Sequence, residues 1–163
     1  MLEYVWGGES NPDMNRAIGE FVAYKTWGDL NSLFPVYSTL GVFKDRTLIA
    51  GVVYHDYSPE HGTIDYSGAT DDPSWLKGAT LHHMFAYPFE RLGCQMVITV
   101  NSANNKRLHR QLRRLDHKAH YIRRLWGRDE DAIHWTFTKE AWEANAIIAR
   151  SRRYALEKEH VST

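Results

Sequence analysis

The feature of this sequence most able to do chemistry is an apolar stretch followed directly by a run of cations. The segment LGCQMVITVNSANNKRLHRQLRRLDHKAHYIRR (residues 92–124) passes through a polar corner into basic residues. From Asn101 to Arg128 nine Lys and Arg residues stand against one acidic residue, Asp116, so a formally neutral chain carries +8 here and −8 elsewhere. This segregation predicts a phosphate-bearing ligand at the corner or a surface for an acidic protein or nucleic acid, unless it is an ordinary solvated helix face.

Length and composition limit the alternatives. The 163 residues suffice for one compact domain, and six Trp, nine Tyr and six Phe can fill its core. A single cysteine, Cys94, cannot form an internal disulfide, and no Cys/His spacing indicates a metal site, so a reducing compartment and no metal are expected. The N-terminus lacks the features of a secretion signal, and no apolar run approaches the length needed to span a membrane.

The pattern of apolar residues and turn signals predicts the elements that must position these charges. Gly28 is expected to end the first helix. Asp72 and Pro73 are expected to begin the second helix, Pro88 to bend it and Gly93 to end it. Strands are expected at residues 2–8, 35–44, 47–57, 62–70, 94–100, 117–126 and 132–139. Helices are expected at residues 11–28, 71–93, 101–115 and 139–160.

This order and several local stretches resemble the GCN5-related N-acetyltransferase (GNAT) family, in particular members that acetylate the N-termini of ribosomal proteins. In MVITVNSANNKRLHRQLRRLDH, Asn105 and Leu115 match that family's strand-corner-helix motif, whereas Asp116 and His117 replace its usual Gly-Phe. The stretch FAYPFERLG resembles the end of its central helix, and the resemblance extends over residues 36 to 145. The residues that fit its final hairpin are Arg124, Asp131, Ala132 and Glu140.

The resemblance implies an α/β (α+β) fold of the GNAT type, with a mixed, mostly antiparallel sheet of six or seven strands flanked by helices. One domain would span residues 1–163, with a core of about 1–140 and an extra helical tail of about 139–160.

The family's cofactor implies a second set of residues. Acetyl-CoA would lie where the strands TIDYSGAT and MVITVNS splay apart, with its pyrophosphate at a helix N-terminus. The family's loop motif is best matched by WLKGAT, although Trp75 and Thr80 depart from it, and nearby Asp71 and Asp72 would repel phosphate unless turned away. The residues expected to bind the cofactor are Ser67, Ala69, Lys77, Gly78, Ala79, Asn105, Lys106 and Arg107. Gly78 could instead be a packing glycine, and Asn105 could also cap its helix.

Amine acetylation further requires a group that takes the amine proton and one that protonates the thiolate. Asp65 is the expected base, with Glu60 and His61 as alternates, although Asp65 could also be a solvated strand residue. Leu112 occupies the place where many relatives have a Tyr that protonates the thiolate. Ser102 or a water molecule would then serve instead.

The resemblance thus implies a cytoplasmic, acetyl-CoA-dependent N-acetyltransferase that acts on a protein N-terminus or a small amine. The alternative is a GNAT-fold scaffold that has lost catalysis, similar to some bacteriophage-encoded proteins found in virions. An acidic assembly partner would then bind the basic helix; nucleic acid is a further possible partner, and a membrane is not expected.

Overall fold

The structure is a computed structural model that describes residues 1–29 and 34–161. Residues 30–33 and 162–163 of the expected domain lie outside the described residues. The strands are β1 (Leu2–Gly7), β2 (Tyr37–Lys44), β3 (Thr47–Ser58), β4 (Thr63–Thr70), β5 (Met96–Ser102), β6 (Lys118–Gly127) and β7 (Glu130–Thr138). The helices are α1 (Pro12–Trp27), α2 (Thr80–Ala86), α3 (Lys106–Arg114), α4 (Lys139–Ala144) and α5 (Ala146–Val161).

The seven strands form one sheet in the order β1-β2-β3-β4-β5-β7-β6. Strands β1 to β4 make an antiparallel meander, and β5, β7 and β6 are also joined antiparallel. Strands β4 and β5 pair in parallel and join the two halves. The expected fold class, a mixed and mostly antiparallel sheet flanked by helices with an extra C-terminal helix, is confirmed.

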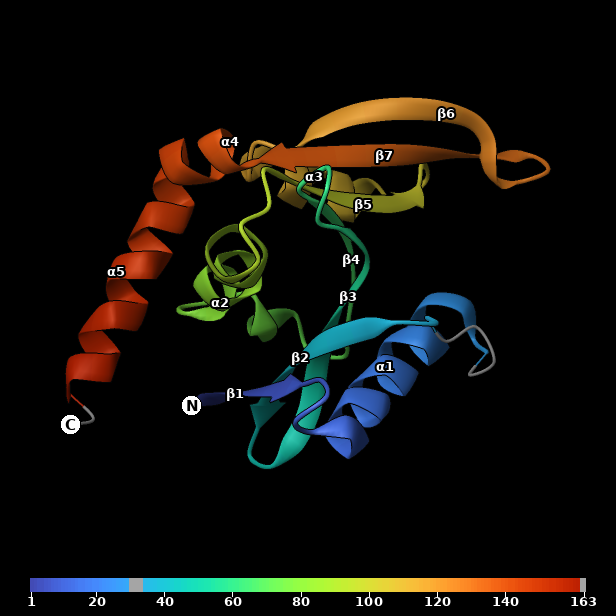
Figure 1. Ribbon diagram of the computed structural model, residues 1–163. Helices are drawn as coiled ribbons and strands as arrows, with labels where there is room; N and C mark the ends of the chain where they lie inside the picture. Colours follow the sequence, from blue (N-terminus) through green and yellow to red (C-terminus); the bar gives the residue numbers. More distant parts are fainter. Residues whose placement is uncertain (30–33, 162–163) are drawn as a thin grey trace.

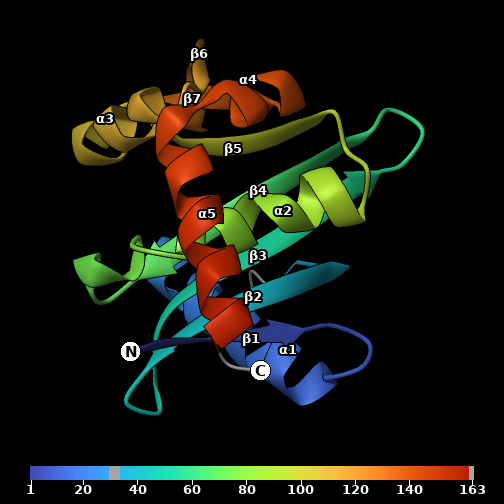
Figure 2. The same cartoon turned by 90° about the vertical axis from the view of Figure 1, so that its left-hand side faces the viewer.

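Helix α1 covers one face of the first half of the sheet, while α2 and α3 lie on the opposite face (Figures 1 and 2). Gly51 of β3 faces α1, where an added Cβ would lie 2.9 Å from Ile18. Tyr54 of β3 faces the other way and donates a hydrogen bond to the Met84 carbonyl of α2 at 2.6 Å. Residues three apart in a strand point to opposite faces, so β3 is covered on both sides.

The segment at residues 71–93 differs from the continuous helix that its caps predict. Asp72 does accept a hydrogen bond from the Ser74 amide, but it caps only a short 3₁₀ turn, η2 (Pro73–Trp75), and α2 begins later, at Thr80. The predicted bend at Pro88 is a π-helical turn, η3 (Tyr87–Arg91). Pro88 has no N–H to donate to the Met84 carbonyl four residues earlier, so that carbonyl is free to accept the Tyr54 hydroxyl.

The C-terminal tail also differs from one continuous helix because Asn145 separates α4 from α5. The Asn145 side chain is buried, and its Oδ1 accepts hydrogen bonds from the Ile147 and Ile148 amides, both at 3.0 Å. Its Nδ2 donates to Asp116 Oδ2 at 2.7 Å. Asp116 has a φ of +59°, so it adopts the left-handed conformation for which the family's glycine is suited.

His117 takes the place of the family's Phe and is buried in the core. Its ring stacks on Phe137, with centroids 4.2 Å apart and an interplanar angle of 14°. Its Nε2 lies 2.8 Å from the Tyr66 hydroxyl. Burial lowers the pKa of the imidazole from 6.5 to about 4, so the ring is neutral in the folded protein at pH 7.

The buried His117 should make stability depend on pH. Between pH 6.5 and about 4 the unfolded chain binds a proton at His117 that the folded protein does not, so stability is present above this window and falls through it. We expect His117 to account for a loss of about 3 kcal/mol in the free energy of unfolding between pH 7 and pH 4. Denaturant unfolding of His117→Phe should show a correspondingly smaller loss. His120→Gln, at an exposed position, serves as the control, and equal losses in wild type and His117→Phe would contradict this assignment.

Candidate functional site

A cleft opens between β4 and β5 because their pairing is short. The paired residues are Thr63 with Met96, Ile64 with Val97 and Asp65 with Ile98. Strand β4 continues to Thr70 and β5 to Ser102, but the two strands no longer pair with each other. The splay expected between TIDYSGAT and MVITVNS is therefore present. Beyond Asp65, the edge of β4 that faces β5 keeps backbone groups with which no strand of the described residues pairs.

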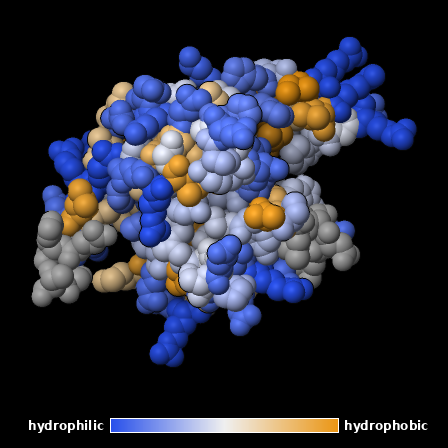
Figure 3. Space-filling view, viewed as in Figure 1, coloured by the Kyte–Doolittle hydropathy of each residue, from blue (hydrophilic) through white to orange (hydrophobic). Residues whose placement is uncertain are grey.

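The resulting hollow, here called the β4–β5 cleft, has a volume of about 700 Å³. On the side of α2 and α3 its walls are apolar and include Tyr66, Phe85 and Leu112. On the side of α1 the walls are polar. The polar group consists of His55, Asp65 and Ser67, and the aromatic residues around it are Trp27, Phe34 and Trp126. In Figure 3 the surface is notched between the β6–β7 end and the part that carries α1.

Asp65 is the last residue of β4 that pairs with β5, and it lies in the polar part of the cleft. Its partial burial raises the pKa of the carboxyl above 3.8, a shift that nearby His55 opposes. A carboxylate of this kind holds a proton more readily than a solvated one, which suits a group that accepts protons.

His55 and Asp56 are additions to the site that the sequence did not indicate. Asp56 Oδ2 lies 2.5 Å from His55 Nδ1, and His55 Nε2 lies 3.0 Å from Ser67 Oγ. The three residues His55, Asp56 and Asp65 offer ligand atoms within 4.8 Å of one another, so they could also hold a divalent cation. Adjacent residues in a regular strand point to opposite faces of the sheet. The sequence VVYHDY therefore does not predict that His55 and Asp56 contact each other at one site.

Ser102, the last residue of β5, and the start of α3 line the side of the cleft opposite β4. The Ser102 hydroxyl donates a hydrogen bond to Glu130 Oε1 at 2.5 Å. Its proton therefore points to Glu130 and not to a leaving thiolate in the cleft. Asn105 caps α3 by accepting the Leu108 amide at 3.3 Å, so the predicted capping is confirmed. Asn105 and Arg107 both line the cleft, whereas Lys106 is exposed at its side.

The loop residues Lys77, Gly78 and Ala79 are not brought to the β4–β5 cleft. They line a separate hollow of about 620 Å³ beside α5. Gly78 has a φ of +56°, an added Cβ would lie 2.9 Å from the Tyr154 ring, and its carbonyl accepts the Ser151 hydroxyl. These contacts are those of a packing glycine. They come from α5, which lies outside the residues that resemble the GNAT family.

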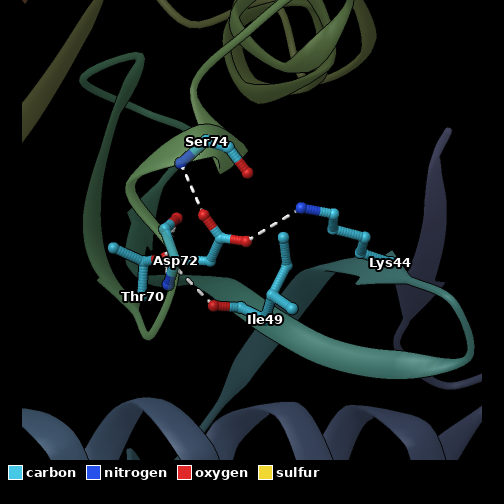
Figure 4. A network of polar contacts seen from close by, with 5 residues as sticks. All are labelled: Lys44, Ile49, Thr70, Asp72 and Ser74. Carbon is cyan, nitrogen blue, oxygen red and sulfur yellow. Dashed lines mark hydrogen bonds and ion pairs between the residues drawn. The ribbon is translucent and has the colours of Figure 1, made fainter.

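The two aspartates at the cleft's outer edge are paired with lysines. Asp71 forms an ion pair with Lys25 of α1. Asp72 lies 3.2 Å from Lys44 Nζ and accepts the Ser74 amide at 2.8 Å, as Figure 4 shows. The hydrogen bonds to Ser74, with help from Lys44, lower the pKa of the Asp72 carboxyl to about 2. The positive charges of Lys25 and Lys44 reduce the repulsion expected between these aspartates and a phosphate.

The nine cations of residues 101–128 are all exposed. Among the described residues none of their side chains forms an ion pair within 4.0 Å. The Arg113 side chain donates a hydrogen bond to the Tyr121 hydroxyl at 3.3 Å. The blue side chains at the upper right of Figure 3 lie where β6 and β7 project in Figure 1. Arg107 is the cation of this set that lines the cleft.

No helix in the described part of the chain is long and apolar enough to cross a membrane. The sequence matches no family model, and no curated protein is significantly similar to it.

Solved structures nevertheless share the fold. A protein of T. thermophilus classed as an acetyltransferase superposes with a TM-score of 0.60 at 18% identity, over 78% of this chain and 69% of that one. A GNAT-family acetyltransferase from Bacillus anthracis gives a TM-score of 0.51 at 16% identity, over 63% and 66%. The spermidine/spermine N-acetyltransferase SpeG from Vibrio cholerae gives a TM-score of 0.67 at 10% identity, over 90% and 99%. The chain therefore has the fold of the GNAT acetyltransferases.

Proposed function

We propose that this protein transfers an acetyl group from acetyl-CoA to a primary amine. The observation that carries the proposal is the opening of the sheet after Asp65, where two parallel strands stop pairing and leave a cleft of about 700 Å³. A thioester carrier is long and narrow, and its amide-containing arm needs unsatisfied backbone groups along its path. The free edge of β4 offers such groups, with the small side chains of Ser67 and Ala69 leaving room beside it.

The phosphates of the carrier would lie toward the start of α3. Asn105 and Arg107 line the cleft there, and Lys106 stands exposed beside them. The amides of the first turn of a helix favour an anion, and Arg107 can add a charge-assisted hydrogen bond. Lys77, which the loop motif assigns to the same task, lies in the other hollow and would not take part.

The amine would enter from the polar, aromatic side of the cleft. A protonated amine is attracted by the Asp65 carboxylate and by the faces of Trp27, Phe34 and Trp126. Asp65 would then take the first proton, because an ammonium group must lose it before it can attack. Leu112 is buried and Ser102 is engaged by Glu130, so a water molecule is the better candidate to protonate the thiolate.

The class of acceptor is a primary amine. A small polyamine fits the carboxylate and aromatic residues at the cleft, and the neighbour from Vibrio cholerae is a spermidine/spermine acetyltransferase. A protein N-terminus, the acceptor implied by the sequence resemblance, presents the same amine on an extended chain.

Binding of acetyl-CoA should stabilise the fold. A ligand at 100 times its Kd adds about 2.7 kcal/mol to the free energy of unfolding, so the melting temperature should rise by several degrees. Differential scanning fluorimetry with acetyl-CoA measures this rise, and release of free thiol in the presence of spermidine or a short peptide reports transfer. An unchanged melting temperature at millimolar acetyl-CoA would instead support the scaffold without catalysis.

Substitutions should separate the two hollows. Arg107→Ala should weaken acetyl-CoA binding by about tenfold or more, since a hydrogen bond to a charged group contributes about 1.5–3 kcal/mol. Ala69→Trp should abolish binding by filling the cleft. Lys77→Ala, its matched control, should change the Kd by less than about twofold. Calorimetric titration checks all three, and a large effect of Lys77→Ala alone would place the cofactor beside α5.

Asp65→Asn should lower kcat by about 10²–10⁴-fold while leaving acetyl-CoA binding intact, because loss of a general base affects the proton transfer. The carboxylate must be ionised to act, so kcat/KM of wild type should rise with pH as Asp65 loses its proton, above the usual range for Asp. Glu60→Gln, an exposed alternate in the preceding turn, should retain wild-type kcat. Full activity of Asp65→Asn would exclude Asp65 as the base.

A further inference from the structure

The hollow beside α5, here called the α5 hollow, is a second place in the fold where a ligand can bind. Its volume of about 620 Å³ falls within the range of about 300–1,000 Å³ that is usual for small-molecule sites. Its lining comes from both ends of the chain, because α5 runs past α2 toward β1 (Figures 1 and 2). Among the described residues, none lines both the α5 hollow and the β4–β5 cleft.

Helix α2 separates the two hollows. Ala79, the N-cap of α2, and His83, four residues later, line the α5 hollow. Leu81 and Phe85, also four residues apart, line the β4–β5 cleft. Residues four apart lie on one face of a helix, so α2 turns one face to each hollow. A ligand in the α5 hollow would therefore be a different molecule from one bound between the strands.

The charge of the α5 hollow is positive. Three lysines from separate parts of the chain, Lys44, Lys77 and Lys158, line it, and none of its described lining residues is acidic. Asp72 is not part of the lining, but its carboxylate lies 3.2 Å from Lys44 Nζ. An ammonium group has three N–H donors, so Lys44 can still bind an anion. Lys77 forms no ion pair within 4.0 Å with any described residue.

Aromatic rings lie next to these lysines. Tyr4 and His83 both line the α5 hollow, with ring centroids 4.5 Å apart. Tyr154 lines it from α5 and is 44% exposed. Lys158 Nζ lies 5.0 Å from the centroid of the Tyr154 ring, so a cation and an accessible ring stand side by side. Aromatic side chains stack on flat rings, and every nucleobase offers such a ring.

We propose that the α5 hollow binds a free nucleotide, with its phosphates at the three lysines and its base against Tyr154. Lysine ammonium groups bind phosphate oxygens as point charges, and several phosphates can engage several lysines at once. A polyamine would be repelled by the same lysines. Acetyl-CoA also carries a nucleotide, but its phosphates are expected near Arg107 on the other side of α2. The inference therefore does not rest on the proposed acetyl transfer.

Calorimetric titration with ATP in the absence of acetyl-CoA tests the assignment. The double variant Lys77→Ala/Lys158→Ala should raise the Kd for ATP by about tenfold or more, because both lysines can donate charge-assisted hydrogen bonds. The matched control Arg110→Ala/Arg114→Ala removes the same charge from α3, where neither arginine lines either hollow, and should change the Kd by less than about twofold. Tripolyphosphate, which lacks the base, should bind wild type about tenfold more weakly than ATP. Retained melting temperatures would show that the variants are folded.

Four results would overturn the nucleotide site. They are no binding of ATP to wild type, equal ATP affinity in wild type and Lys77→Ala/Lys158→Ala, equal affinity for ATP and tripolyphosphate, and loss of ATP binding in Arg107→Ala, which would place the nucleotide in the β4–β5 cleft. Displacement of ATP by acetyl-CoA would assign the α5 hollow to the cofactor and overturn it as well. Lysine-dependent ATP binding without any acetyl-CoA-dependent rise in melting temperature would keep the nucleotide site and reject the proposed acetyl transfer.

Discussion

The three-residue parallel pairing of β4 with β5 is the constraint on which the rest of the structure depends. Those three residue pairs join the meander of β1 to β4 to the half of the sheet formed by β5, β7 and β6. Beyond them, β4 and β5 diverge and no longer pair with each other. Backbone groups at the divergence cannot be satisfied by the sheet, so they are available to a ligand. The apolar face of the cleft comes from α2 and α3, and its polar face from β3, β4 and the end of α1.

The charged residues around the β4–β5 cleft differ in whether they are paired. The acidic residues at its outer edge, Asp71 and Asp72, are each matched by a lysine from another element, Lys25 and Lys44. Asp65, by contrast, lies inside the cleft next to a histidine. The cations of α3 and β6 remain exposed, and Arg107 at the start of α3 reaches the cleft. Of the nine cations of residues 101–128, Arg107 lines the cleft, and the other eight are exposed and do not line it.

The element order was predictable because it depends on short-range patterns, whereas the splay was expected from the resemblance to the GNAT family. Weak alternation in β2, the β-branched and aromatic residues of β3, the glycines that bound β4, the Gly28 stop and the Asn105 cap are local signals. They gave the element order, whose resemblance to the GNAT family led to the correct fold. The errors came where a distant residue decides the local structure. Tyr154 and Ser151 of α5 hold Gly78 away from the cleft, and Asn145 breaks the tail to bond Asp116. His55 and Asp56 could not be predicted together because a bulge, invisible in the sequence, turns them to one site.

The most direct test of the account is a crystal structure of the protein soaked with acetyl-CoA. We predict density for the pantetheine arm between β4 and β5 beyond Asp65, with the thioester next to Ser67 and the phosphates toward Arg107. Density in the hollow beside α5, or a gap between the strands that side chains fill and no ligand enters, would contradict the central claim.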